Sequence, residues 1–188
     1  MKDIYILLTR TGTALGSAIK LYTRGSWSHA SIALDENLEE LYSFSRKYTW
    51  NPFFGTFMEE DIEGGVFAVK TETQCMVLKV SVTDEQYASA EDIINRFRAN
   101  KQAYGYSVLG LIYFMLGRPR YSSSKYTCAG FVTHVIEGAQ VAEFEKHGSL
   151  VQPDDFMHLD AEVVYEGLLR DYRKTRKWMV RRMAASVI

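Results

Sequence analysis

Residues 27–46, Trp-Ser-His-Ala-Ser-Ile-Ala-Leu-Asp-Glu-Asn-Leu-Glu-Glu-Leu-Tyr-Ser-Phe-Ser-Arg, contain two short alternating stretches separated by a polar turn. Residues 28–34 and 41–46 have the period-two pattern of strands. Asp35, Glu36 and Asn37 between them favour a reversal of the chain. The stretch therefore predicts an antiparallel β-hairpin, and the rest of the fold can be extended from it in both directions.

The register of this hairpin follows from how it sorts side chains onto the two faces. A turn over residues 36–38 places Ser45 opposite His29 and Ser43 opposite Ser31. One face then carries small polar side chains and the other carries large apolar ones. We prefer this register because it sorts the two kinds so cleanly. It leaves His29 among small residues, and such a face would let a helix approach closely.

Apolar runs on either side of the hairpin predict further strands at residues 4–9, 66–70, 76–82 and 163–168. Helices are expected within residues 14–25, after Thr83 where Thr-Asp-Glu-Gln has capping-box spacing, over residues 106–116, and after Ser124. Residues 51–65, with Pro52 and several glycines, are expected to form a long loop. This order of elements predicts one α+β domain over residues 1–188, with a mostly antiparallel sheet packed against a helix that carries Cys128.

Cys128 lies in Tyr-Thr-Cys-Ala-Gly-Phe-Val (residues 126–132), on the apolar stripe of its predicted helix. Either Ser124 or Thr127 caps this helix, so Cys128 falls within its first turn or just past it. Unsatisfied backbone N–H groups and the positive end of the helix dipole favour a thiolate there, and could also stabilise an oxyanion. Simple packing is the competing interpretation, since free cysteines are commonly buried. Cys75, in mid-strand, is interpreted as packing alone.

Four histidines could serve as a base for Cys128, and their positions separate them. His134 follows six residues later, about 120° around the same helix, and cannot reach the thiol. His147 and His158 lie in loop-like sequence, where exposure is the default. His29 begins a strand on a face of small residues, and Ser43, Ser45 or Glu60 could orient its ring. We therefore predict Cys128 as nucleophile and His29 as base.

The two motifs together resemble a known family. A helix-start cysteine in Tyr-Thr-Cys-Ala-Gly-Phe-Val, preceded far upstream by Ser-His-Ala-Ser-Ile-Ala-Leu on a strand, resembles the circularly permuted papain-like hydrolases. These form the YiiX-like branch of the NlpC clan, which includes the lecithin retinol acyltransferase relatives. The resemblance spans residues 4–168, including the Tyr-Ser-Phe-Ser-Arg-Lys strand (42–47) and the Pro-Asp-Asp-Phe segment (153–156). It implies a permuted papain-like fold, with Cys128 as nucleophile and His29 as general base.

Family members commonly carry a clear polar third residue, such as His, Glu or Asn, on the strand after the catalytic histidine. This sequence offers only Ser43 or Ser45 on the inferred face, so the third residue is left open between these two and Glu60. Family enzymes that act on the cell wall usually have a secretion signal or wall-binding repeats. This chain has neither, which disfavours peptidoglycan as the substrate.

These motifs lead us to expect a cysteine hydrolase that cleaves an amide or ester bond in a small peptide-like or acylated substrate. A lipid-directed thiol acyltransferase or lipase is one alternative, and a catalytically silent papain-like binding module is another. Residues 50–57, with Tyr104 and Tyr106, are a candidate wall of the substrate cleft. No cofactor is implied, and the cysteines and histidines do not fall at zinc-ligand spacings.

Composition limits the partners and the compartment. The chain has 188 residues, 47% of them hydrophobic, and a net charge of −1, so no global field recruits nucleic acid. Its longest apolar run, residues 108–116, is too short for a transmembrane segment. Two cysteines and no recognisable signal-peptide core favour a cytoplasmic location. The basic C-terminal stretch fits a solvated terminal helix better than a contact with an anionic surface.

Overall fold

A computed structural model describes residues 1–11, 25–48, 51–107, 113, 116–119 and 122–185. Its centre is a six-stranded sheet with the order β4-β3-β2-β1-β5-β8, in which every neighbouring pair is antiparallel. The strands are β1 Lys2–Arg10, β2 His29–Ala33, β3 Leu41–Tyr48, β4 Asn51–Glu60, β5 Gln74–Val82 and β8 Glu162–Leu168. Two short strands, β6 Gly105–Tyr106 and β7 Lys125–Tyr126, form a separate parallel pair. The α+β class and the antiparallel sheet are as the sequence predicted.

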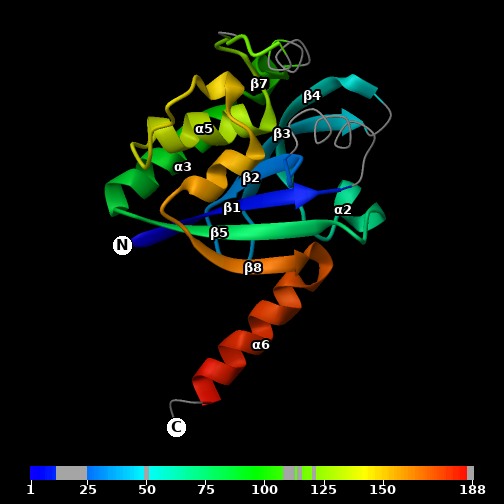
Figure 1. The fold of residues 1–188 in the computed structure, drawn as a ribbon, viewed down its shortest axis with the longest axis vertical. Coiled ribbons are helices and arrows are strands. Elements are labelled where there is room, and N and C mark those ends of the chain that lie inside the picture. The colour runs from blue at the N-terminus through cyan, green and yellow to red at the C-terminus, as the bar shows by residue number, and fades with distance from the viewer. Residues whose placement is uncertain (12–24, 49–50, 108–112, 114–115, 120–121, 186–188) are drawn as a thin grey trace.

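Helices occupy both sides of this sheet (Figure 1). The α-helices are α2 Gly65–Val69, α3 Asp84–Ala99, α5 Cys128–Gly138 and α6 Tyr172–Ala185. Short 3-10 helices are η1 Lys101–Ala103, η2 Gly148–Leu150, η3 Pro153–His158 and η4 Leu169–Asp171. The predicted capping box of α3 is present, because Thr83 Oγ1 accepts from Gln86 N–H at 3.1 Å and Gln86 Oε1 accepts from Thr83 N–H at 3.0 Å.

The hairpin of β2 and β3 has the predicted register at the two residue pairs that it forms. Ile32 pairs with Tyr42 and Ala33 pairs with Leu41, as expected for a turn centred on residue 37. The predicted pairings of Ser45 with His29 and of Ser43 with Ser31 are not part of this ladder. The Asp35 carboxylate holds this turn by accepting the backbone N–H groups of residues 37, 39 and 40 at 2.6–2.8 Å.

The two faces of the sheet pack against different partners. Ala30 and Ile32 of β2 lie in a core cluster with Phe131 and Val132 of α5. Ala33, one residue further along, lies in a second cluster on the other face. Strand alternation assigns His29 and Ser31 to that second face. The expectation that α5 would approach over the small-residue face is therefore wrong, because the apolar stripe of α5 is buried against the apolar face of the sheet.

Two predicted elements are of the wrong type. Residues 51–60, expected to be loop, form strand β4 at the edge of the sheet. An edge strand tolerates Pro52 and Gly55, and a register irregularity lies opposite, between Arg46 and Tyr48. Residues 66–70, expected to be a strand, form the short helix α2, in which Phe67 is the buried side chain.

Two predicted helices fall mostly on residues that are not described. The helix expected within residues 14–25 lies almost wholly outside the described part of the chain. The helix expected over residues 106–116 does not begin at residue 106, because Tyr106 is part of β6. Most of its remaining residues also lie outside the described ones.

Candidate active site

His29 is the first residue of β2, and the backbone before it is fixed at two points. Asp154, in the Pro-Asp-Asp-Phe segment, accepts the N–H groups of Ser26 at 2.6 Å and Trp27 at 3.2 Å. The Ser28 N–H donates to the carbonyl of Thr9 on β1 at 3.0 Å. A segment that is distant in sequence therefore determines where the imidazole stands.

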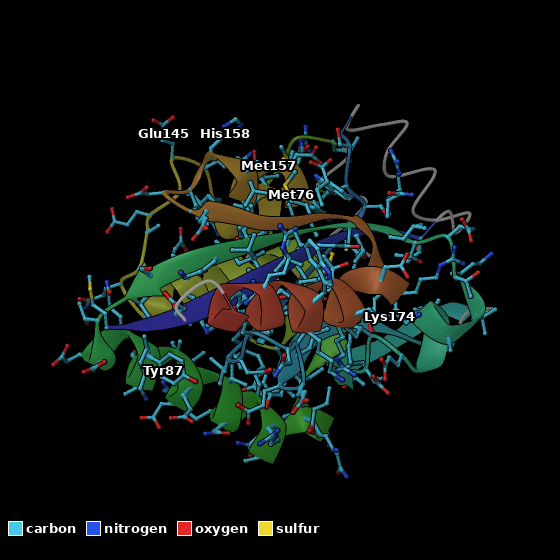
Figure 2. The ribbon with its side chains drawn as sticks, turned by 90° about the horizontal axis from the view of Figure 1, so that it is seen from below. Met76, Tyr87, Glu145, Met157, His158 and Lys174 are labelled. Atoms are coloured by element: carbon cyan, nitrogen blue, oxygen red, sulfur yellow. The ribbon has the colours of Figure 1, made fainter. Side chains whose placement is uncertain are left out.

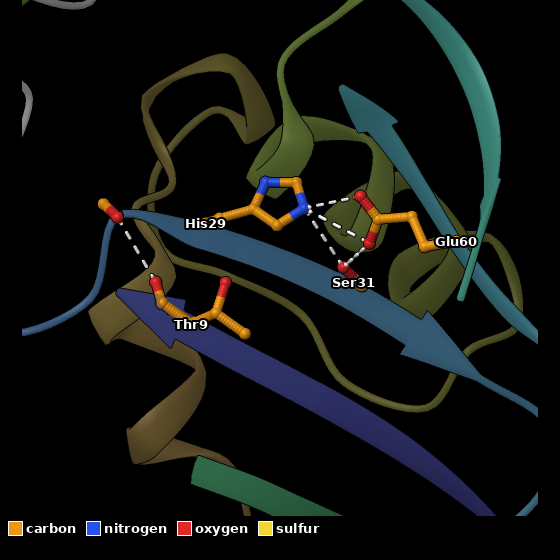
Figure 3. Close-up of polar contacts among 5 residues, drawn as sticks. Thr9, His29, Ser31 and Glu60 are labelled. Carbon is orange, nitrogen blue, oxygen red and sulfur yellow. Dashed lines mark hydrogen bonds and ion pairs between the residues drawn. The ribbon is translucent and has the colours of Figure 1, made fainter. Parts of the chain in front are cut away.

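Glu60, the last residue of β4, binds one nitrogen of this imidazole (Figure 3). Nε2 of His29 lies 3.0 Å from Oε1 and 3.3 Å from Oε2 of the carboxylate. Ser31 donates its hydroxyl to Oε2 of Glu60 at 2.5 Å and lies 3.2 Å from the same Nε2. Glu60 and Ser31 therefore hold Nε2 of His29, and Nδ1 is the ring nitrogen left to face a nucleophile.

Cys128 is the first residue of α5, and Thr127 is the N-cap. The Thr127 hydroxyl accepts the N–H of Gly130 at 3.0 Å. A Cβ at residue 130 would lie only 3.0 Å from that hydroxyl oxygen, so glycine allows the tight first turn. The first intrahelical bond runs from Phe131 N–H to Thr127 C=O at 3.0 Å. The N–H groups of Cys128 and Ala129 therefore point out of the helix start.

The thiol of Cys128 and the imidazole of His29 meet at the end of the sheet. The two groups lie close enough to shift each other's pKa, and the backbone N–H groups of Ala30 and Ala129 also lower the pKa of the thiol. Each residue is the first of its element, His29 of β2 and Cys128 of α5. The structure thus brings Cys128, His29 and Glu60 together from α5, β2 and β4.

The charges of these three groups support one another. Burial raises the pKa of Cys128, but the hydrogen bond and positive charge of His29 outweigh it and lower that pKa below its ordinary value. Burial likewise opposes protonation of His29, yet the Glu60 carboxylate raises the pKa of His29 well above 6.5. The same attraction, with hydrogen bonds from His29 and Ser31, lowers the pKa of Glu60 despite its burial. All three shifts favour the charged forms, which are a thiolate, an imidazolium and a carboxylate.

The other candidates for the third position are less well placed than Glu60. Ser43 is fully buried beside the carboxylate and helps to lower the pKa of Glu60. Ser45 pairs with Thr56 across β3 and β4, and no hydrogen bond joins it to His29 among the described contacts. Ser31 was not proposed for the site, although strand alternation had placed it on the face of His29. Glu60 lay in a stretch interpreted as loop, which hid its pairing with Leu41.

The proposed aromatic wall of a cleft is wrong where it can be assessed. Phe57 is buried between Phe44, Phe97 and Phe131. Tyr104 packs on Phe97 with ring centroids 4.3 Å apart. Phe57 is therefore core and Tyr104 is a half-buried ring packed against it, and the side chains of residues 50–54 and 106 lie outside the description.

A pocket of about 650 Å³ does border α5, on the side away from the sheet. It begins at Thr127, the neighbour of Cys128, and continues past Gly130 to His134. Lys125 and Lys146 line it together with the aromatic rings of Tyr126 and Phe144, so its wall is mixed. The His134 ring packs against Phe97 and Tyr126, away from the thiol.

Among the described residues, no three His, Cys, Asp or Glu side chains gather in a way that could hold a metal ion. No helix among them has the length and apolar character needed to cross a membrane. No family model matches this chain, and no curated protein or solved structure matches it.

Proposed function

We propose that this chain is a cysteine hydrolase that forms an acyl-enzyme on Cys128, with His29 as acid and base and Glu60 as the residue that orients His29. The observation that carries the proposal is the buried row of Cys128, His29 and Glu60, in which the thiol pKa is lowered although burial opposes ionisation. Active sites are where such shifts gather. The order of the motifs, His29 strand before Cys128 helix, supports a permuted papain-like arrangement.

The proposed reaction has two steps. The Cys128 thiolate attacks the carbonyl carbon of an amide or ester, and the carbonyl oxygen takes negative charge near the backbone N–H groups at the start of α5. His29 gives its proton to the leaving nitrogen or oxygen as the carbon–leaving-group bond breaks. His29 then takes a proton from water, the hydroxide attacks the thioester, and the acid and the thiolate are released.

Glu60 contributes to this cycle through His29 alone. Its carboxylate holds Nε2, which keeps Nδ1 directed at the sulfur and stabilises the imidazolium before acyl transfer. Ser31 fixes the carboxylate in turn by donating its hydroxyl to Oε2. Both are therefore proposed as positioning residues.

The proposed substrate is small and peptide-like or acylated, and a pocket of about 650 Å³ beside Thr127 is of a size that could hold part of it. A lipid-directed acyltransferase or lipase uses the same chemistry with a different acyl donor. A silent binding module would keep the fold and lose turnover.

The test is acylation of the whole chain with a panel of 4-nitrophenyl esters, N-acyl peptide amides and phospholipids. Intact mass and peptide mapping should show an acyl group on Cys128, with turnover of at least one class of donor. Cys128→Ala should abolish both signals, and Cys75→Ala should preserve them. The phospholipid arm separates the lipid-directed alternative from the others.

Two results would overturn the proposal. If the Cys128 thiol does not react with iodoacetamide at neutral pH, Cys128 is not the nucleophile. A reactive thiol that no acyl donor in the panel can acylate would favour the binding module instead.

A further inference from the structure

Helix α6 is attached to the body at its first turns only and then runs away from the sheet (Figure 1). The hydroxyl of Tyr172 donates to the carbonyl of Glu36 at 2.6 Å, and Arg173 Nε donates to the carbonyl of Asn37 at 3.1 Å. Arg176 forms an ion pair with the Glu36 carboxylate. These contacts fix the start of the helix to the β2–β3 turn and set its direction.

The side of α6 that faces solvent carries a basic stripe, which we define as Lys174, Lys177, Trp178 and Arg182. Their spacing of i, i+3, i+4 and i+8 places them on one face of the helix. Trp178 is 55% exposed, and the Arg182 guanidinium lies 4.7 Å from the centre of its ring. Lys174, labelled in Figure 2, is also exposed and lies 4.0 Å from Asp171, a surface pair of little strength.

The charge of the chain is divided between α6 and the remainder. Residues 172–185 include six Lys and Arg and no Asp or Glu, whereas the whole chain has a net charge of −1. The remainder therefore carries −7. A flat anionic surface would attract the helix and repel the body, which orients the molecule with α6 towards that surface.

We propose that the basic stripe of α6 docks on the surface of an anionic lipid membrane. Lys174, Lys177 and Arg182 would lie against lipid phosphate and carboxylate groups, and Trp178 would enter the headgroup region. An exposed indole among cations is typical of interfacial anchors, because its ring is apolar and its N–H stays wet. Binding along an extended nucleic acid fits less well, since the anionic body would be drawn beside the same polyanion.

The test uses the full chain with phosphatidylcholine vesicles that contain or lack phosphatidylserine. Binding by co-sedimentation should require phosphatidylserine and weaken as salt rises. A Lys174→Gln/Lys177→Gln/Arg182→Gln variant should lose roughly 100-fold in partition coefficient. Lipids brominated near the headgroup should quench tryptophan emission in the native protein, and Trp178→Phe should remove that quenching.

The matched control is Lys70→Gln/Lys101→Gln/Arg118→Gln, which removes three exposed cations elsewhere and should keep most of the binding. Circular dichroism and Cys128 labelling should be unchanged in both triple variants, so a failure of the proposed hydrolase does not affect this result. Equal losses in the two triple variants would overturn the proposal, as would binding that does not need phosphatidylserine. Stripe-dependent binding to a single-stranded oligonucleotide without vesicle binding would also overturn it.

Discussion

Cys75 near the start of β5 and Cys128 at the start of α5 are both buried and free, yet the pKa values of their thiols shift in opposite directions. Cys75 is fully enclosed in the second core cluster, and burial raises its pKa to about 12. Cys128 is almost as buried, but its pKa is lowered because His29 and two backbone N–H groups face the sulfur. Burial alone therefore does not decide the reactivity of a cysteine, and the partners of the sulfur do.

Iodoacetamide labelling of the native protein gives the sharpest form of this comparison. At pH 7 Cys128 should react at least about a thousandfold faster than Cys75, because a thiol with a pKa of about 12 is almost never ionised there. Peptide mapping by mass spectrometry measures both sites in one sample. Similar rates at the two sites would remove the basis of the comparison.

Replacement of His29 should make Cys128 resemble Cys75. In His29→Gln the imidazolium is gone while burial stays, so the pKa of Cys128 should rise and labelling at pH 6.5 should fall about 100-fold. The matched control is His134→Gln, since His134 lies against Phe97 and Tyr126. A thiol equally reactive in both variants would mean that His29 does not govern it.

Glu60→Gln should act on Cys128 indirectly, through His29. Without the carboxylate the pKa of His29 should fall, which an NMR titration of its ring carbon measures. Glu59→Gln is the control, because Glu59 is exposed and pairs with Arg98. No difference between the two variants would remove Glu60 from the positioning role.

The pair of His29 and Glu60 should also make the free energy of unfolding depend on pH. A raised pKa of His29 in the folded chain stabilises the fold below that pKa and loses its effect as pH rises through it. A lowered pKa of Glu60 stabilises the fold above that pKa and loses its effect as pH falls through it. Glu60→Gln should therefore lower the unfolding free energy of the chain most at pH values that lie between the pKa of Glu60 and the pKa of His29. Urea unfolding over a pH series measures it, and a difference independent of pH would contradict the ion pair.

The smallest effects are expected from the helix caps. Thr127→Ala and Thr83→Ala should each cost about 1 kcal/mol in unfolding free energy, since each removes one hydroxyl that accepts an N–H at a helix start. Only Thr127→Ala should also slow Cys128 labelling, by a factor of about two to three, because it loosens the turn that holds the sulfur. Equal labelling in both variants would show that the cap of α5 has no part in the acidity of Cys128.

Local patterns were reliable where a single period or motif dominated. The hairpin register, the Thr83 capping box and the strands around residues 4–9 and 76–82 all agree with the structure. Predictions of secondary structure were wrong where packing against other parts of the chain decides between strand, helix and loop. Pro52 and Gly55 normally indicate a loop, but on an edge strand the missing donor and the missing side chain cost little. Residues 66–70 have no clear period, and the helical turn there buries only Phe67.

The sequence by itself placed Cys128 within or just past the first turn of a helix and His29 near the start of a strand, because caps and alternation act over a few residues. It also indicated that Cys75 is packing, since a mid-strand position faces the core. Only the tertiary structure decided that Glu60 meets Nε2 of His29, because Glu60 lies 31 residues later and the contact depends on how β4 adds to the sheet. The acidity of Cys128 was likewise decided in three dimensions, since it is set by groups from α5 and β2 that share no local pattern.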